Sequence, residues 1–359
     1  MIIGIDFRFG YKSNRGMGTY AREIVRCLAK IDTVNQYILY IDNGMACEDF
    51  QFPANFVFRK LKGGYFSYEQ FYLPRQLKQD HVSILWCPYN TFPLCLSARV
   101  KLFVTVHDLI FMGKLSSKNP YQLLGKYYRR FNLKWGVRRI DELFTVSNYS
   151  ARLLFNHFGR TAYVTPNHVS VLPMSIKTIE EEQILKKFGV TAKSYFYLIT
   201  GNAPSKNITV LKRVMYDMCE ETFVVTGIGE RDWKCHPKHI HVTGFVTEKE
   251  KNVLLKNARA FLFLSLEEGF GIPLLEAMRF DCKILASDCS VIPEIVGDGG
   301  YCIAPTEDSI KYAIRHFDTP SWGTSEGRLK QLTKYSSWEQ SATILANVIK
   351  KEYEKDFSN

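Results

Sequence analysis

Hydrophobic residues follow two alternating patterns along this chain. Short apolar runs, which predict buried strands, are separated by segments with apolar residues at every third or fourth position, which predict helices. The strands predicted in the first half are Ile2–Ile5, Tyr37–Ile41, Phe56–Arg59, Ile84–Trp86, Leu102–Val106 and Glu142–Val146. The helices predicted between them are Thr19–Lys30, Tyr68–Lys78, Pro120–Arg138 and Tyr149–Phe158. This order is typical of an α/β fold whose helices connect parallel strands.

A second series of the same kind follows. Its predicted strands are Tyr195–Thr200, Phe223–Thr226, Ile240–Val242, Ala260–Leu264, Lys283–Ala286 and Tyr301–Ile303. Its predicted helices are Ile208–Met218, Glu248–Asn257, Leu274–Phe280 and Ser309–Phe317. Two such series in 359 residues predict two Rossmann-like domains. We place their boundary in the proline-containing segment Pro166–Pro173, which gives domains of residues 1–168 and 169–336 and a last helix at about Ser337–Lys355.

The segment Ser265–Glu276 carries the clearest chemical signal. Gly269 and Gly271 allow a tight turn, and Pro273 suits the first turn of the helix that follows. Such a helix end presents free N–H groups and a positive dipole, which bind phosphate. Glu268 and Glu276 flank it and can accept hydrogen bonds from hydroxyls. A ligand that suits both features carries phosphate and a polyol together, as a nucleotide sugar does.

This segment resembles the Glu-x7-Glu motif of the retaining glycosyltransferases of family 4, which have the GT-B fold. His107 and Asp108 resemble the family's His-Asp segment, while Glu69-Gln70 and Asn90-Thr91 resemble its mannosyltransferase-like branch. Further matches, in chain order, are Val146-Ser147, Lys206-Asn207, Gly244–Val246, Val291–Gly297 and Trp338.

The resemblance implies two Rossmann-like domains whose parallel sheets face a central cleft. Residues 1–168 would form the acceptor-side domain, residues 169–336 would bind the donor, and the helix in 337–359 would cross back to the first domain. The expected reaction is retaining transfer of a hexose from a GDP- or UDP-linked donor, of the GDP-mannose or UDP-glucose type. The acceptor would be a hydroxyl of a glycan or of a lipid-linked acceptor.

The resemblance also assigns roles to residues of this sequence. The catalytic candidates are His107, Lys206 and Glu268, with the charge change of histidine near neutral pH available for the reaction. The donor-binding candidates are Gly16, Gly18, Gly227, Phe245, Val246, Phe270, Gly271, Leu274, Leu275 and Glu276. The backbone N–H groups of Phe270, Gly271, Leu274 and Leu275 would hold the sugar and phosphates. Glu69, Asn90 and Asp108 are acceptor-side candidates, Asp108 mainly as an orienting or capping residue.

Two positions depart from simple expectations. Gly16 and Gly18 are expected in a loop before the first helix, where they fit a weak dinucleotide-binding pattern. Ser205 stands where the family usually has an arginine beside the lysine, so a second cation is either missing or supplied elsewhere, by Arg8 or Arg213. The substitution leaves room for an inactive or weakly active nucleotide-sugar-binding relative. Another GT-B enzyme, such as a nucleotide-sugar epimerase or a polymerase like glycogen synthase, is a further alternative. An NAD-dependent enzyme would need the glycines closer to the strand end at Asp6.

The net charge of +11 favours anionic partners. Residues 119–140 contain basic residues and no acidic one; the basic residues are Lys126, Arg129, Arg130, Lys134, Arg138 and Arg139. Among them Tyr127, Tyr128, Phe131 and Trp135 form an apolar stripe at helical spacing. The stripe either packs on the core or contacts an anionic membrane or a lipid-linked acceptor. We expect no nucleic-acid partner, because no recognition motif accompanies the charge.

Cysteine usage and the search for motifs complete the expectations. The nine cysteines form no C-x-x-C pair, which favours reduced thiols and a cytoplasmic location, peripheral to the cytoplasmic face of a membrane if the stripe binds there. The sequence contains no Asp-x-Asp motif and no His/Cys/Asp cluster at metal-ligand spacing. We therefore expect no tightly bound cofactor or metal, and at most stimulation by divalent ions. The sequence does not specify an oligomeric state.

Overall fold

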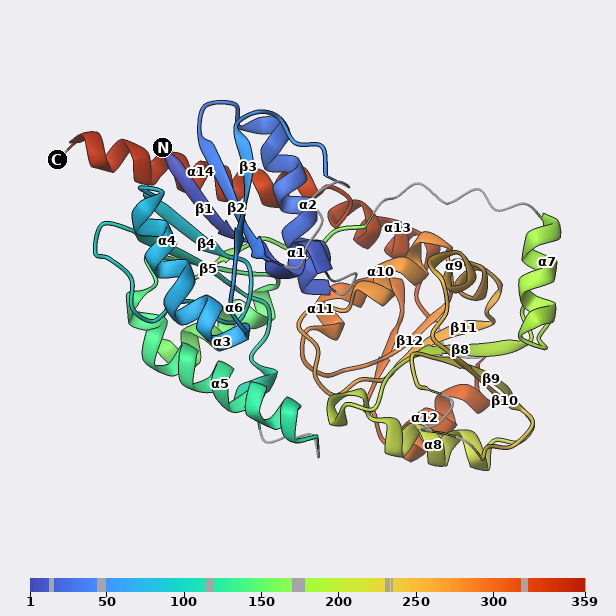
Figure 1. Cartoon of the computed structure of the whole chain (residues 1–359). Helices are drawn as coiled ribbons and strands as arrows, with labels where there is room; N and C mark the ends of the chain where they lie inside the picture. Colours follow the sequence, from blue (N-terminus) through green and yellow to red (C-terminus); the bar gives the residue numbers. More distant parts are fainter. Residues whose placement is uncertain are drawn as a thin grey trace. The chain divides into compact units, whose positions relative to one another are not determined.

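The computed structural model describes residues 1–12, 16–43, 50–113, 119–169, 178–229, 233, 235–317 and 322–358. These residues form two compact units. Unit 1 contains the described residues of Met1–Lys114, Lys118–Asn167 and Ser337–Asn359, and unit 2 those of His168–Ser336. Each unit consists of a parallel sheet with helices packed on it (Figure 1).

The sheet of unit 1 has the strand order β3-β2-β1-β4-β5-β6-β7, with all neighbours parallel. Its strands are β1 Ile2–Asp6, β2 Gln36–Asp42, β3 Phe56–Leu61, β4 Ile84–Cys87, β5 Lys101–Val106, β6 Glu142–Thr145 and β7 Tyr163–Val164. Its helices are α1 Arg8–Lys12, α2 Gly16–Ile31, α3 Tyr65–Ser67, α4 Leu73–Gln79, α5 Pro120–Gly136, α6 Asn148–Phe158 and α14 Trp338–Ser358. Both faces of β4 and β5 are buried, which explains why their sequences are continuous apolar runs rather than alternating ones.

The sheet of unit 2 has the order β10-β9-β8-β11-β12-β13, again with parallel neighbours. Its strands are β8 Tyr195–Ile199, β9 Thr222–Thr226, β10 Ile240–Gly244, β11 Ala260–Phe263, β12 Ile284–Ser287 and β13 Tyr301–Ile303. Its helices are α7 Thr178–Lys187, α8 Ile208–Asp217, α9 Glu248–Asn257, α10 Ile272–Arg279, α11 Ile292–Val296, α12 Glu307–Arg315 and α13 Ser325–Lys334. The predicted fold class of two Rossmann-like parallel-sheet domains is confirmed.

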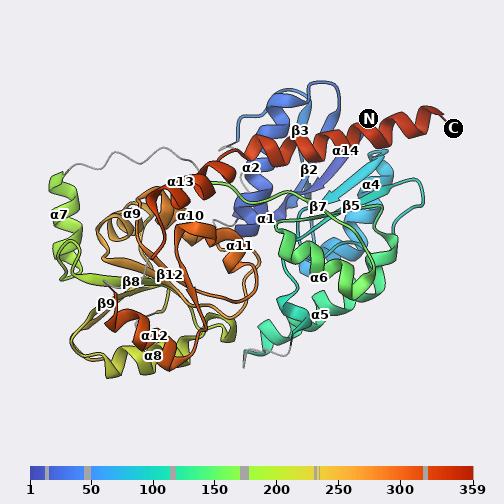
Figure 2. The ribbon, with the colours of Figure 1, turned by 180° about the vertical axis from the view of Figure 1, so that it is seen from behind.

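The last helix, α14, belongs to unit 1 and lies alongside α2 (Figure 2). At its start the rings of Trp338 and Tyr20 meet edge to face, with their centroids 6.1 Å apart. Ser341 Oγ also donates a hydrogen bond to the carbonyl of Pro166 at 2.9 Å. These contacts attach α14 to α2 and to the segment that follows β7.

Every strand predicted from the apolar runs is present, with no end shifted by more than two residues. The sequence does not predict the two-residue strand β7 or the helices α1, α3, α7, α11 and α13. Between α3 and α4 the chain makes a π-helical turn, Tyr68–Tyr72, before Pro74, which has no N–H to continue regular helical bonding. Glu69 and Gln70 lie on this turn. The segment Pro166–Pro173, predicted to contain the boundary, is described only to residue 169.

The prediction that Gly16 and Gly18 lie in a loop is wrong. Both lie in the first turn of α2. The buried face of this helix begins at Gly18 and continues through Ala21, Val25 and Leu28 at helical spacing. Packing of that face outweighs the low helix propensity of glycine, which costs about 1 kcal/mol per residue relative to alanine.

Candidate active site

Lys206 and Glu268 form an ion pair in unit 2. Lys206 ends a short 3₁₀ turn after β8, and Glu268 follows β11, the neighbour of β8 in the sheet. Lys206 Nζ lies 2.6 Å from Glu268 Oε1, and both side chains are partly buried. Adjacent parallel strands deliver the loops that follow them to the same sheet edge, where ligands bind in such folds. Two of the predicted catalytic residues are thus brought together.

The glycine turn before α10 has the expected backbone conformation. Gly271 caps α10 with φ +98°, a conformation that side chains rarely tolerate. The loop is held from two sides, because Leu266 N–H donates to Ser205 O at 2.7 Å and Glu268 N–H donates to Ser290 Oγ at 3.2 Å. Ser205 stands where the resemblance leads us to expect an arginine. Its carbonyl holds this loop and its side chain is buried, so the residue has a structural role.

Not every backbone N–H group at the N-terminus of α10 is free to bind a ligand. The N–H of Leu274 donates to the carbonyl of Gly271 at 3.0 Å, so a phosphate would have to share this donor with the turn. The side chains of Leu274 and Leu275 are fully buried core residues. The ring of Phe270 is buried edge to face against Tyr335, with the centroids 5.3 Å apart.

Glu276, the second carboxylate of the motif, is paired with Lys251 of α9 at 2.8 Å. Lys251 also contacts Glu248 at 2.9 Å. Burial lowers the pKa of Lys251, but the two carboxylates outweigh that effect and raise it above the ordinary value. Sequence reasoning missed Lys251, because nothing in the pattern of α9 distinguishes it from the other lysines there.

Gly227 joins the ends of three neighbouring strands. It has φ +93°, and a Cβ at this position would lie 2.4 Å from the carbonyl oxygen of Thr200. Its N–H donates to Gly244 O at 2.8 Å. Phe245 and Val246 follow β10, and the Phe245 side chain is 80% exposed. Arg213, one of the two residues considered as a second cation, is exposed on α8.

In unit 1 the predicted residues His107 and Asn90 are in direct contact. Asn90 Oδ1 accepts the backbone N–H of His107 at 2.7 Å. The His107 ring is buried, 4.9 Å from the Tyr20 ring in an edge-to-face arrangement, and its Nε2 lies 2.9 Å from Pro88 O. A carbonyl only accepts, so Nε2 carries the proton in this contact.

The expectation that His107 changes charge near neutral pH is wrong. Burial lowers the pKa of His107 to about 4, against the opposing effect of the bond to Pro88. The ring is therefore neutral at pH 7. Asp108 is partly exposed, and its Oδ1 accepts the N–H of Ile110 at 3.1 Å, as expected for a capping residue.

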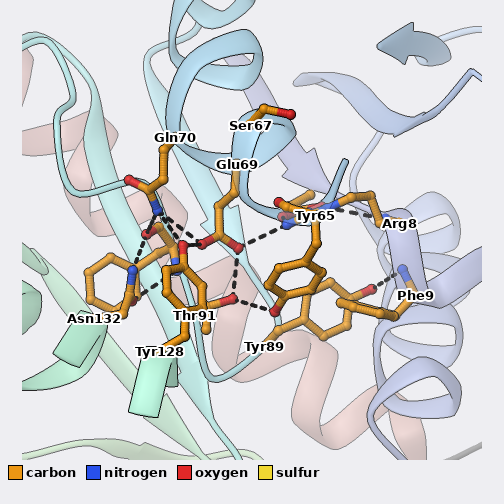
Figure 3. A network of polar contacts seen from close by, with 12 residues as sticks. Arg8, Phe9, Tyr65, Ser67, Glu69, Gln70, Tyr89, Thr91, Tyr128 and Asn132 are labelled. Carbon is orange, nitrogen blue, oxygen red and sulfur yellow. Dashed lines mark hydrogen bonds and ion pairs between the residues drawn. The ribbon is translucent and has the colours of Figure 1, made fainter. Parts of the chain in front are cut away.

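Glu69 is the centre of a buried polar network (Figure 3). Its carboxylate accepts hydrogen bonds from Arg8 at 2.9 Å, Thr91 Oγ1 at 2.7 Å, Tyr128 Oη at 2.5 Å and Gln70 Nε2 at 3.0 Å. Glu69 is fully buried, so it acts on its surroundings through these partners rather than by direct contact with a ligand.

The charge of Arg8, one of the two residues considered as a second cation, is compensated within unit 1. Its guanidinium is buried and paired with Asp6 at 2.7 Å as well as with Glu69. Burial lowers the pKa of Arg8, but the two carboxylates outweigh it and hold the pKa well above the ordinary value. The arginine is a structural cation within unit 1.

The aromatic stripe of α5 is largely exposed. Tyr127, Phe131 and Trp135 are 57%, 52% and 70% exposed, so the interpretation that this stripe packs on the core is wrong for these three residues. Tyr128 is half-buried and joins the Glu69 network. The basic residues Arg130, Lys134 and Arg138 are exposed as well.

None of the described helices combines the length and apolarity required of a membrane span. Among the described residues, no group of three or more His, Cys, Asp or Glu side chains is placed to hold a metal ion.

Two family models match the chain. The model of Glycosyltransferase Family 4 matches residues 14–178, and that of Glycosyl transferases group 1 matches residues 180–318. The O-antigen chain mannosyltransferase RfbU of Salmonella typhimurium is 25% identical over 260 residues, which are 67% of this chain and 67% of that protein. The O-antigen chain mannosyltransferase B of Escherichia coli is 28% identical over 46% of this chain, and the match spans only about half (48%) of that relative.

The solved structures include the Anabaena protein HepE in complex with UDP and glucose. It superposes with a TM-score of 0.70 at 12% sequence identity, covering 97% of this chain and 99% of that one. At this identity the likeness shows a shared fold.

Proposed function

Because this chain belongs to glycosyltransferase family 4, with the GT-B fold, we propose that it transfers a hexose with retention from a nucleoside-diphosphate sugar to an acceptor hydroxyl. The observation that carries this proposal is the Lys206–Glu268 pair beside the glycine-capped end of α10. A cation and a helix N-terminus at one sheet edge suit a diphosphate, and the adjoining carboxylate suits sugar hydroxyls.

In the proposed reaction the bond between the anomeric carbon and the diphosphate oxygen breaks. The acceptor oxygen bonds to the same face of that carbon, and its proton passes to the departing phosphate oxygen. Lys206 and the N-terminus of α10 would stabilise the negative charge that develops on the leaving group, which is typically the largest catalytic contribution in such sites. Glu276 would accept hydrogen bonds from the ribose hydroxyls.

Mannose is the sugar we favour, because the relatives are named as O-antigen mannosyltransferases. The HepE complex, which contains UDP and glucose, supports a nucleotide donor bound by this fold and keeps UDP-glucose as the second candidate. GDP-mannose and UDP-glucose are therefore the two donors to test. We propose a glycan or lipid-linked hydroxyl as the acceptor.

The experiment measures release of nucleoside diphosphate from GDP-mannose and UDP-glucose, with and without EDTA, followed by NMR of the product anomer. We expect release from one donor, an α-linked product from an α-linked donor, and turnover that persists in EDTA. A binding-only relative would release no diphosphate, and an epimerase would alter the sugar without transferring it. An inverted product anomer would contradict the retaining mechanism.

We further propose that α5 contacts the surface of an anionic membrane. Tyr127, Phe131 and Trp135 expose aromatic rings on one side of this helix, and Arg130, Lys134 and Arg138 expose positive charge beside them. Helices with this combination lie in the interface, with the apolar side chains inserted and the basic ones near anionic headgroups.

A further inference from the structure

Unit 1 contains a cavity of about 610 Å³ between the first turns of α5, the segment around Phe9 and the loop after β4. Its walls are mainly aromatic, with Phe9, Tyr65, Tyr89 and Tyr128 among the lining residues. It lies directly against the Glu69 network of Figure 3, because Thr91 and Tyr128 belong to both.

The cavity exists because one face of α5 has a core partner along only half of its length. Gly125, Arg129, Asn132 and Gly136 follow one another at helical spacing on this face. At Gly136 a Cβ would lie 2.4 Å from the Phe92 ring, so the helix packs tightly there. At Gly125 the atoms within 4 Å of an added Cβ belong to Arg129 of the same helix. The same face of α5 thus packs on the core in the second half of the helix and lines the cavity in the first half.

The hydroxyl groups of Tyr65, Tyr89, Thr91 and Tyr128 in the cavity wall are engaged by other groups of the protein. Tyr65 Oη bonds Thr91 Oγ1 at 3.0 Å, and Tyr128 Oη donates to Glu69. Tyr89 Oη accepts the N–H groups of Phe9 and Gly10 at 3.0 and 2.7 Å. The buried Glu69 carboxylate therefore holds Tyr128 and Thr91 with their hydroxyls turned into the protein. The remaining surface is mainly carbon, with Asn90, Tyr121 and Arg129 as its other polar residues, and suits a hydrocarbon better than the hydroxyls of a sugar.

One charged side chain modifies this apolar character. Arg129 is the charged residue among the described lining residues, and it forms no ion pair with a described residue. Its guanidinium carbon lies 6.0 Å from the centre of the Phe111 ring. A guanidinium beside an apolar cavity, with no ion-pair partner among the described residues, favours a ligand with an anionic group next to its hydrocarbon part.

We propose that this cavity binds the hydrocarbon chain of a phosphate-linked lipid acceptor, with the phosphate at Arg129 and with Glu69 as a positioning residue for the cavity wall. The proposal rests on the proposed function and names its acceptor class. The chain would hold the acceptor on unit 1 while its terminal sugar hydroxyl receives the hexose.

Calorimetry with geranyl phosphate, geraniol and inorganic phosphate tests the site without requiring turnover. The wild-type protein is expected to bind geranyl phosphate best, geraniol more weakly and inorganic phosphate not measurably. Gly125→Leu fills the cavity and replaces glycine by a better helix former, so we expect it to fold and to weaken geranyl phosphate binding about tenfold or more. Gln122→Leu, which adds the same side chain at an exposed position of α5 outside the cavity lining, is the matched control and is expected to bind as wild type.

Two further variants separate the contributions. Arg129→Gln should weaken the binding of geranyl phosphate about tenfold, while the affinity for geraniol stays unchanged. Glu69→Gln should weaken the binding of both geranyl phosphate and geraniol. Its affinity for a nucleoside diphosphate, proposed to bind to unit 2, should stay at the wild-type value and serves as the check that the protein is folded.

The outcomes are distinct for the two proposals. Wild-type affinity of Gly125→Leu for geranyl phosphate overturns the cavity assignment even if sugar transfer is found. Cavity-dependent binding without any diphosphate release from nucleotide sugars leaves the site standing and overturns the proposed function. Equal, cavity-dependent binding of dioctanoyl phosphatidic acid would identify a membrane lipid, rather than an acceptor, as the occupant and overturn the acceptor assignment.

Discussion

The ammonium group of Lys206 lies 2.6 Å from the carboxylate of Glu268, although 62 positions separate the two residues in the chain. The cation proposed to meet the leaving diphosphate is thus paired with the carboxylate proposed to meet the donor sugar. A bound diphosphate would compete with Glu268 for Lys206, so the two side chains must have opposite effects on diphosphate affinity.

We therefore expect Glu268→Gln to bind the free nucleoside diphosphate as tightly as wild type or more tightly, while donor cleavage falls. Lys206→Ala should weaken diphosphate binding and lower kcat by roughly 100-fold or more, the usual effect of removing one group that stabilises developing charge. Calorimetry and diphosphate release measure the two effects. Lys330→Ala, an exposed lysine of unit 2, is the control. Weaker diphosphate binding in Glu268→Gln would contradict the competition.

The Lys251–Glu276 pair predicts coupling between two helices in donor binding. Glu276→Ala should raise the dissociation constant of the donor nucleotide about tenfold, because a hydrogen bond to a charged group contributes ~1.5–3 kcal/mol. Lys251→Met should change affinity in the wild-type background and have little effect in Glu276→Ala, which a double-mutant cycle detects. Glu248→Gln removes only the outer partner of Lys251 and is the control. Additive effects of the two substitutions would show that Lys251 does not act through Glu276.

Arg8 is expected to support the fold rather than the leaving diphosphate. Arg8→Ala leaves the buried carboxylates of Asp6 and Glu69 without their cation, which typically costs about 3–5 kcal/mol of unfolding free energy. Arg26→Ala, which breaks an exposed pair with Glu23, should cost less than about 1 kcal/mol. Urea unfolding measures both. Normal stability of Arg8→Ala together with lost donor cleavage would return Arg8 to the active site.

The buried neutral His107 predicts a pH dependence of stability. Its pKa is about 4 when folded, below the ordinary value near 6.5, so between these values the unfolded chain binds a proton that the folded protein does not. The free energy of unfolding is therefore at its full value above pH 6.5. It decreases as the pH falls towards 4, by about 1.4 kcal/mol per pH unit for one histidine. His107→Gln, which keeps a donor for Pro88 O, should reduce this slope, while exposed His157→Gln should not. An unchanged slope in His107→Gln would contradict the neutral assignment.

The α5 stripe predicts binding to anionic vesicles. The triple variant Arg130→Gln, Lys134→Gln and Arg138→Gln should cosediment less with vesicles containing phosphatidylserine, because each basic residue near the surface contributes about 1 kcal/mol. Trp135→Ser should reduce binding at high salt as well, since its contribution is apolar. Nucleotide release from a soluble donor should remain at wild-type level in both variants. Wild-type protein that does not bind these vesicles at low salt would exclude the membrane role of α5.

The sequence alone predicted the strands and the paired αβ series, since buried parallel strands are continuous apolar runs and this pattern lies in neighbouring residues. It also identified Glu268, Gly271 and Glu276, because a glycine turn before a helix is a local requirement of backbone geometry. Lys206 was recognised by its resemblance to the basic pair that the family has after this strand. These features depend on short stretches of chain and are therefore readable without the fold.

Tertiary structure decided what those residues contact. Lys251 meets Glu276 across two helices, and Arg8 is enclosed by Asp6 and Glu69, pairings that no local pattern records. The burial that makes His107 neutral depends on Tyr20 and Pro88. The stripe of α5 is exposed because the residues by which this helix packs on the core, Asn132, Leu133 and Gly136, lie on its other side. Hydrophobic spacing states that a helix has an apolar face, but only the packed structure determines whether that face is covered, because burial depends on elements distant in the chain.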